Sequence, residues 1–223
     1  MLPARRLYRF FAVEDDVYLA NLMGSHFRGF HIPLSGRNVL PEYLRDCFFR
    51  PYDEFDVGVA FEEMVAFDNL IYIRHDTCSD PVGCVITYAH ELQHFVQYGH
   101  TPRVWAVNSA LYHNLGQFDP TATPIDIPQE REANIVSKRV AERVCGAKAV
   151  RKYAEEQISF MERVNEPVQA ARWVFFRDVP PSTDYDVLTA TVPFVEKYKS
   201  QIDFGIDVNQ SNWWVGPLPQ NLL

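Results

Sequence analysis

The segment "YAHELQHFVQYGH", residues 88–100, carries three histidines and one glutamate within eleven positions. His90 and His94 are four residues apart, and on a helix this spacing puts both imidazoles on one face, where they can reach a single metal ion. Glu91 lies beside them, in position to deprotonate a water molecule without binding the metal itself. The HExxH string therefore predicts a hydrolytic metal site, and zinc is the expected ion.

The surroundings of the string favour a metal site over a pair of ordinary core histidines. Residues 84–89 carry no charge, and the positions between and after the two histidines are uncharged or apolar. A carboxylate and two imidazoles buried side by side are costly unless each is paired. The alternative is a set of paired core histidines with a capping or surface glutamate, and we expect the zinc site instead.

A catalytic zinc ion usually takes three protein ligands, and more than one residue could be the third. His100 has the outer spacing of the metzincin pattern HExxHxxGxxH, but Gln97 replaces the glycine at which that pattern turns the chain. Glu130 follows His94 by 36 residues (130 − 94), enough for a helix, a loop and a return. Glu132 is close by, although an acidic residue in a first helical turn is also explained by the helix dipole. We favour Glu130 as the ligand, with Glu132 and His100 as alternatives.

Asn134 follows Glu130 by one turn, on the same face of the expected helix. This spacing resembles the gluzincin arrangement, in which a Glu ligand is followed one turn later by an Asp that hydrogen-bonds a ligating histidine. Such bonds fix the tautomer of the imidazole. Asn134 can accept through its amide oxygen but brings no charge.

The strings "AHELQHFVQYG" and "EREAN" resemble the ImmA/IrrE-type zinc metallopeptidases, whose motif is an HExxH helix followed by an E-x-E-A-(N/D) helix. The resemblance covers roughly residues 68–146, of which about ten positions are diagnostic. It implies His90, His94 and Glu130 as zinc ligands, Glu91 as general base, and a selective bacterial protease acting on a protein or peptide. The chain departs from the motif after "EAN", and no N-terminal helix-turn-helix is evident. The string "AHELQHFVQ" is also similar to zincin cores found beside bacterial toxins, so the substrate class stays open.

Helix-end signals indicate the elements that position these residues. Asp80-Pro81 and Gly99 bound a helix over 81–98, and Pro128 and Gly146 bound another over 128–145. Further helices are expected at 14–27, 41–49, 103–115, 147–164, 166–177 and 186–200. Short runs rich in Val, Ile, Phe and Tyr indicate strands at 56–61, 63–67 and 69–74.

Together these elements predict a single α+β domain over residues 1–223, with a zincin-like fold. A small antiparallel or mixed sheet should pack on the HExxH helix, and the C-terminal half should be mostly helical. The catalytic core is expected at about 55–165 and a helical extension at about 166–223. The strand at 63–67 or 69–74 could hold a peptide substrate by β-addition. Trp213 and Trp214 should pack back on the body.

A peptidase also needs a group that stabilises the oxyanion formed when the peptide carbonyl is attacked. His75, Tyr112, His113 and Tyr153 are candidates, and spacing does not distinguish them. A different class of function is a zincin-fold module that binds a partner without cleaving it. Intact Glu91 argues against that class, because a binding module has no need of the base.

The composition and charge of the chain limit which classes of binding partner can be expected. The chain has 223 residues, a net charge of −8 and a pI near 5.3, which argues against nucleic acid or an anionic membrane as the main partner. No apolar run approaches the roughly 20 residues needed to span a bilayer. The N-terminal stretch meets acidic residues too soon to supply the apolar region of a signal peptide. Four scattered cysteines without a CxxC pair indicate the reducing cytoplasm.

Overall fold

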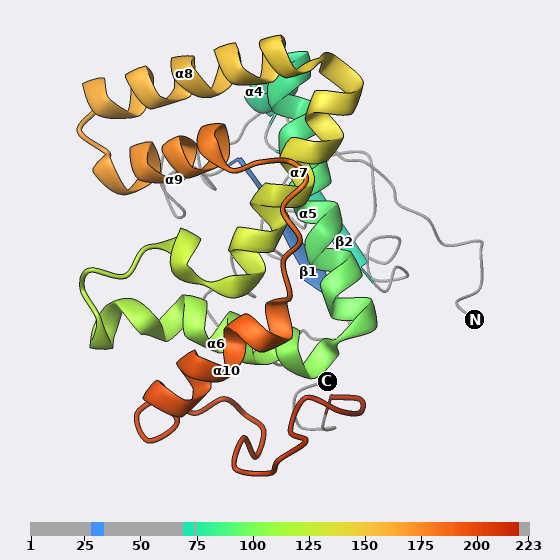
Figure 1. Cartoon of the computed structure of the whole chain (residues 1–223), viewed down its shortest axis with the longest axis vertical. Coiled ribbons are helices and arrows are strands. Elements are labelled where there is room, and N and C mark those ends of the chain that lie inside the picture. Colours follow the sequence, from blue (N-terminus) through green and yellow to red (C-terminus); the bar gives the residue numbers. More distant parts are fainter. Residues whose placement is uncertain (1–27, 34–68, 74, 219–223) are drawn as a thin grey trace, which may run out of the picture.

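The structure, a computed structural model, describes residues 28–33, 69–73 and 75–218 (Figure 1). Helices α5 (Pro81–His100) and α7 (Pro128–Cys145) pack against each other at its centre. The helical hairpin of α8 (Ala147–Arg163) and α9 (Pro167–Asp178) covers one end of this pair. Helices α6 (Pro102–Phe118) and α10 (Val187–Tyr198) lie at the other end. The helices expected at 14–27 and 41–49 and the strands expected at 56–61 and 63–67 lie outside the described residues.

The expected α+β class is wrong, because the described part of the chain is mostly helical. Its strands, β1 (Gly29–Pro33) and β2 (Asn69–Ile73), form one antiparallel pair with Gly29 opposite Ile73. Among the described residues no broader sheet is present, and a pair of five-residue strands cannot form a layer of a fold by itself. The strand pair packs on α5, and the remaining contacts between elements are mostly between helices.

Helix α5 begins where the sequence predicts. The side chain of Asp80 accepts hydrogen bonds from the backbone N–H groups of Val82 (2.8 Å) and Gly83 (2.9 Å), and Pro81 occupies the first helical turn. The helix does not stop at Gly99 but continues through His100. A short helix, α4 (His75–Cys78), precedes it and packs on it.

The remaining helices are also confirmed, with ends that differ from the expected ones by at most three residues. Helix α7 begins at Pro128 and stops before Gly146, whose positive φ of 86° favours a residue without a side chain. The Pro- and Thr-rich connection before α7 contains a single 3-10 turn, η2 (Pro124–Asp126). In the part of the chain that the structure covers, no helix is both long and apolar enough to cross a membrane.

Two apolar clusters hold the helices together. The first joins α6, α10 and the C-terminal tail, and includes Val107, Leu111, Val195 and Trp213. Trp213 is buried and Trp214 packs against the same cluster, which confirms the expected return of the tail onto the body. The second cluster joins α5, α7, α8 and α9. Its buried members include Ile86, Ala141, Val150, Ala154, Ile158, Met161, Trp173 and Phe176.

Gly83 lets α8 approach the first turn of α5 closely. A Cβ atom on Gly83 would lie 2.9 Å from Cζ of Tyr153, nearer than two carbon atoms can pack. Tyr153 has little room to move, because it is buried against Trp173 and its hydroxyl is bonded to Arg28. Gly83→Ala should therefore lower the free energy of unfolding by about 1–3 kcal/mol, as expected for overpacking. Urea denaturation followed by circular dichroism measures this change.

Gly99→Ala is the matched control on the same helix, because a Cβ atom there meets nothing within 4 Å. Alanine is preferred to glycine inside a helix by about 1 kcal/mol, so this variant should be neutral or slightly more stable. Equal losses in both variants would contradict the packing argument.

Candidate metal centre

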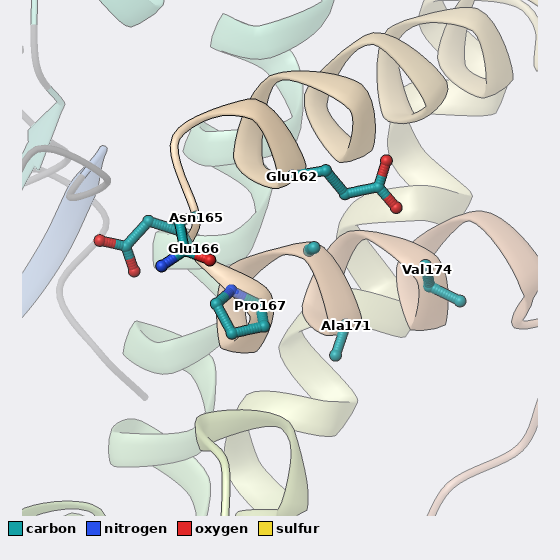
Figure 2. A pocket seen from close by; sticks show the side chains of 7 residues that line it. Glu162, Asn165, Glu166, Pro167, Ala171 and Val174 are labelled. Atoms are coloured by element: carbon teal, nitrogen blue, oxygen red, sulfur yellow. The ribbon is translucent and has the colours of Figure 1, made fainter.

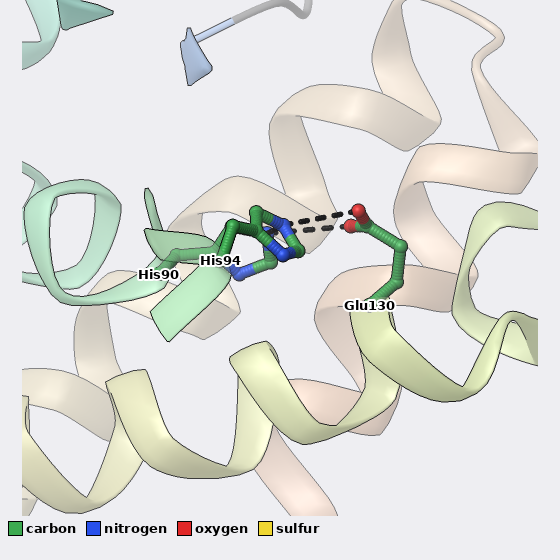
Figure 3. Close-up of side chains that lie close together, drawn as sticks. All are labelled: His90, His94 and Glu130. Atoms are coloured by element: carbon green, nitrogen blue, oxygen red, sulfur yellow. Dashed lines mark hydrogen bonds and ion pairs between the residues drawn. The ribbon is translucent and has the colours of Figure 1, made fainter. Parts of the chain in front are cut away.

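His90 and His94 project from α5 toward Glu130 in the first turn of α7 (Figure 3). All three are buried, with exposed fractions of 6%, 8% and 8%. His90 Nε2 lies 3.1 Å from His94 Nε2, while Glu130 lies 3.3 Å from the first nitrogen and 3.1 Å from the second. The packing of α5 against α7 thus brings together the three residues that the sequence puts forward as ligands.

These spacings fit a tetrahedral metal ion. Zinc–ligand bonds of about 2.0–2.1 Å at tetrahedral angles separate neighbouring donor atoms by about 3.3 Å. The three donors lie 3.1–3.3 Å apart, so one ion could bind all of them with little movement of the side chains. Two imidazoles and a carboxylate also form the donor set of many hydrolytic zinc sites.

The charges of the three side chains favour a cation between them. Burial lowers the pKa of His90 to about 4. Burial is the largest effect on His94 and acts to lower its pKa, but the charge and hydrogen bond of Glu130, together with Glu91 and Gln97, outweigh it and raise that pKa to about 9. Burial acts to raise the pKa of Glu130, yet charged His94 and hydrogen bonds from both histidines hold it well below its usual range. Without metal, the positive charge of protonated His94 therefore balances the negative charge of Glu130. A metal cation could replace that proton.

Glu91 is buried next to this triad, with 6% of its surface exposed. Burial raises its pKa to about 7, against the opposing effect of His94. The backbone N–H of His31 in β1 donates a hydrogen bond to the carboxylate, so the strand pair reaches the site. A carboxyl group that titrates near neutral pH can both accept and return a proton, as a general base requires.

The two alternative ligands do not join the triad. His100 is exposed at the last residue of α5. Glu132 accepts hydrogen bonds from Gln93 (3.0 Å) and Gln97 (2.8 Å) instead. The side-chain N–H of Asn134 donates to the backbone carbonyl of Glu130, one turn earlier, and so supports the turn that carries the carboxylate.

Gln97 has the role that the sequence assigned to Asn134. Its oxygen lies 2.8 Å from His94 Nδ1. Its nitrogen donates to the carbonyl of Gln129 (3.0 Å) and to Glu132, both of which can only accept, so the oxygen must face the histidine. His94 therefore donates from Nδ1, which leaves Nε2 to face the triad. This role was not expected, because Gln97 stands where the metzincin pattern has glycine, but its position three residues after His94 puts it on the same helix face.

Gln97→Leu should weaken metal binding by about 10- to 100-fold, because the partner that orients His94 is lost while the donors remain. Competition with a chromophoric chelator measures the zinc affinity. His100→Ala is the control on the same helix and should leave the affinity unchanged. A Gln97→Leu protein that binds zinc as tightly as wild type would show that the triad needs no such support.

Arg172 in α9 is a further residue at the site, and sequence reasoning missed it. Its Nη2 lies 3.2 Å from His90 Nε2 and 3.5 Å from Glu130. Tyr112 in α6 is also near: burial of its hydroxyl end and the charge of Glu130 raise its pKa to about 12, although 46% of the residue is exposed. No local pattern could have found Arg172, because only the packing of α9 on α7 brings it to the triad.

The other residues expected to stabilise an oxyanion either lie away from the triad or have side chains outside the described part of the structure. Tyr153 is buried in the second cluster, and His113 is exposed, with Nδ1 lying 2.7 Å from the carbonyl of Ser109. The side chain of His75 is outside the described part of the structure. A separate pocket of about 390 Å³ lies where α8 meets α9 and shares no residue with the triad. Its lining residues include Glu162 and Pro167 (Figure 2).

Comparison of the chain with known proteins found no matching family model, no matching curated protein and no matching solved structure.

Proposed function

We propose that this protein is a zinc-dependent metallopeptidase that hydrolyses peptide bonds in a protein or peptide substrate. The observation that carries the proposal is the buried triad of His90, His94 and Glu130, whose donor atoms have the spacing of a tetrahedral zinc site. Glu91 beside this triad supports a catalytic site, because a metal site with only a structural or binding role needs no buried base.

A zinc ion held by the triad would supply a Lewis acid for the peptide carbonyl and for the attacking water. Glu91 removes a proton from that water and later returns it to the leaving nitrogen of the peptide. His90, His94 and Glu130 hold their positions through two opposed helices, and Gln97 keeps Nδ1 of His94 occupied. Because these groups are buried, bulk water is excluded from the base and its partners.

The strand proposed here to hold the substrate is β1, and not the strand expected at 69–74, which is its partner β2; the other candidate, 63–67, lies outside the described residues. The backbone of β1 at His31 is hydrogen-bonded to Glu91, and within the described residues β1 pairs only with β2. We propose that an extended peptide lies along β1, which would align the scissile bond with the base. We also propose a cytoplasmic location, which the scattered spacing of the cysteines supports.

The test uses wild-type protein reconstituted with zinc. Elemental analysis should find about one zinc ion per chain, and incubation with a pool of proteome-derived peptides should produce new peptide termini by mass spectrometry. One zinc ion without new termini would favour a non-catalytic module that binds a partner. Failure to take up zinc would refute the metal site and with it the proposed activity.

A further inference from the structure

Arg172 brings a guanidinium group into contact with the candidate metal ligands. The nitrogen Nη2 lies 3.2 Å from His90 Nε2 and 3.5 Å from Oε2 of Glu130. Both distances are close to the separation of about 3.3 Å expected between neighbouring donors around a tetrahedral ion. In the structure without metal, Nη2 therefore lies at or close to the position that the fourth, open coordination site of such an ion would take, and the Arg172 side chain is 29% exposed.

The helix that carries Arg172 is fixed relative to Glu130. Lys138 of α7 donates to the backbone carbonyls of Arg177 and Val179 at the end of α9, each at 2.6 Å. Arg131, next to Glu130 in sequence, stacks over the ring of Phe175 at 5.0 Å. Trp173 and Phe176 of α9 are buried in the second apolar cluster. These contacts fix the rotation of α9 and hold Arg172 toward the triad.

The chemistry of a guanidinium group suits a developing anion. Arginine stays charged at every relevant pH and presents several N–H donors in a planar fork. Without metal, Arg172 helps to neutralise Glu130. A divalent cation in the triad would take over that task and repel the guanidinium, which would then be free to donate to an oxygen next to the ligands.

We propose that Arg172 is a catalytic residue that hydrogen-bonds the carbonyl oxygen of the scissile peptide bond and stabilises the negative charge this oxygen gains during attack. The inference rests on the proposed peptidase function and adds to it the residue that stabilises the oxyanion. Tyr112 is the competing donor, but its hydroxyl has no such direct contact with the triad among the interactions of the described residues.

The test needs no substrate, because a tetrahedral anion can replace the reacting carbonyl. The protein is loaded with Co²⁺ in place of zinc, and inorganic phosphate is titrated while the visible cobalt bands are recorded. Arg172→Gln should hold cobalt with an affinity within about threefold of wild type, since only a repelling charge is lost. It should bind phosphate at least about 10-fold more weakly, because a charge-assisted hydrogen bond is missing.

Arg177→Gln is the matched control on the same helix. Its side chain pairs with Asp178, while the contact with Lys138 uses only its backbone carbonyl, so both affinities should equal those of wild type. Arg172→Lys keeps the charge without the fork and should bind phosphate with intermediate affinity.

Two results would overturn the inference while leaving the peptidase proposal intact. In the first, wild type holds cobalt but shows no response to phosphate, or Arg172→Gln responds as wild type does. In the second, Arg172→Gln and Arg172→Lys both lose cobalt, which would make Arg172 a support for the ligands. Wild-type protein that takes up neither cobalt nor zinc refutes the metal site itself, and the inference falls with it.

Discussion

Glu130→Ala is expected to abolish stoichiometric zinc binding. The carboxylate is one of three donors, and its removal leaves two imidazoles whose nitrogens lie 3.1 Å apart, without the negatively charged ligand that completes the donor set. The zinc affinity should fall by more than about 100-fold. Removal of a residue that only hydrogen-bonds a metal ligand lowers affinity by about 10- to 100-fold, and removal of a ligand itself should cost more. Elemental analysis of the purified variant and titration with a competing chelator measure it.

Glu132→Ala and Glu142→Ala provide graded controls on the same helix. Glu132 holds Gln97, which orients His94, so its loss should weaken zinc binding by about 10-fold or less. Glu142 pairs with Lys138 (3.8 Å) and is not part of the site, so its removal should leave zinc binding unchanged. If Glu132→Ala loses the metal and Glu130→Ala keeps it, the ligand assignment is wrong.

Glu91→Gln is expected to stop hydrolysis without removing the metal. Glutamine has the same shape and can still accept the hydrogen bond from the backbone of His31, but it cannot take a proton from water at neutral pH. A positioned general base typically contributes about 10²- to 10⁴-fold, so kcat/KM should fall by at least about 10²-fold. Kinetics on whichever peptides the wild-type protein cleaves measure the change.

Zinc content and thermal unfolding separate this effect from misfolding. Both should match wild type, because the substitution removes no ligand and replaces a buried acid by a neutral group of equal volume. A variant that holds zinc and still cleaves at the wild-type rate would show that another group is the base.

Local signals in the sequence predicted the helices well. The helix that carries the histidines depends on Asp80 and Pro81 at its start, and α7 depends on Pro128 and Gly146 at its ends. These effects act within one turn, so they can be read without knowing the fold. Among the described residues, the strand expected at 69–74 is present as β2, whereas its partner β1 was not expected. Apolar runs are compatible with strands, but the pairing of strands depends on distant segments, so the fold class could not be predicted from them.

In the candidate site, too, some residues could be predicted from local sequence signals and others depend on the tertiary fold. Helical spacing groups His90, Glu91 and His94, and Glu130 could be favoured because it follows His94 by enough residues for a helix, a loop and a return. Gln97 could have been predicted from its position on the helix face that carries the ligands, three residues after His94. Arg172 could not have been found, since its approach depends on how the α8–α9 hairpin folds back on α7.

The straight course of α5 through His100 has a consequence for how the protein is made. Because the helix does not turn back after His94, the third donor must come from Glu130, 36 residues later in synthesis (130 − 94). A growing chain that ends between these residues contains two of the three residues of the candidate triad. If the triad binds a metal, tight binding would have to wait until α7 has been translated and has docked on α5. The site would therefore take up its ion only in chains whose central helix pair is already assembled.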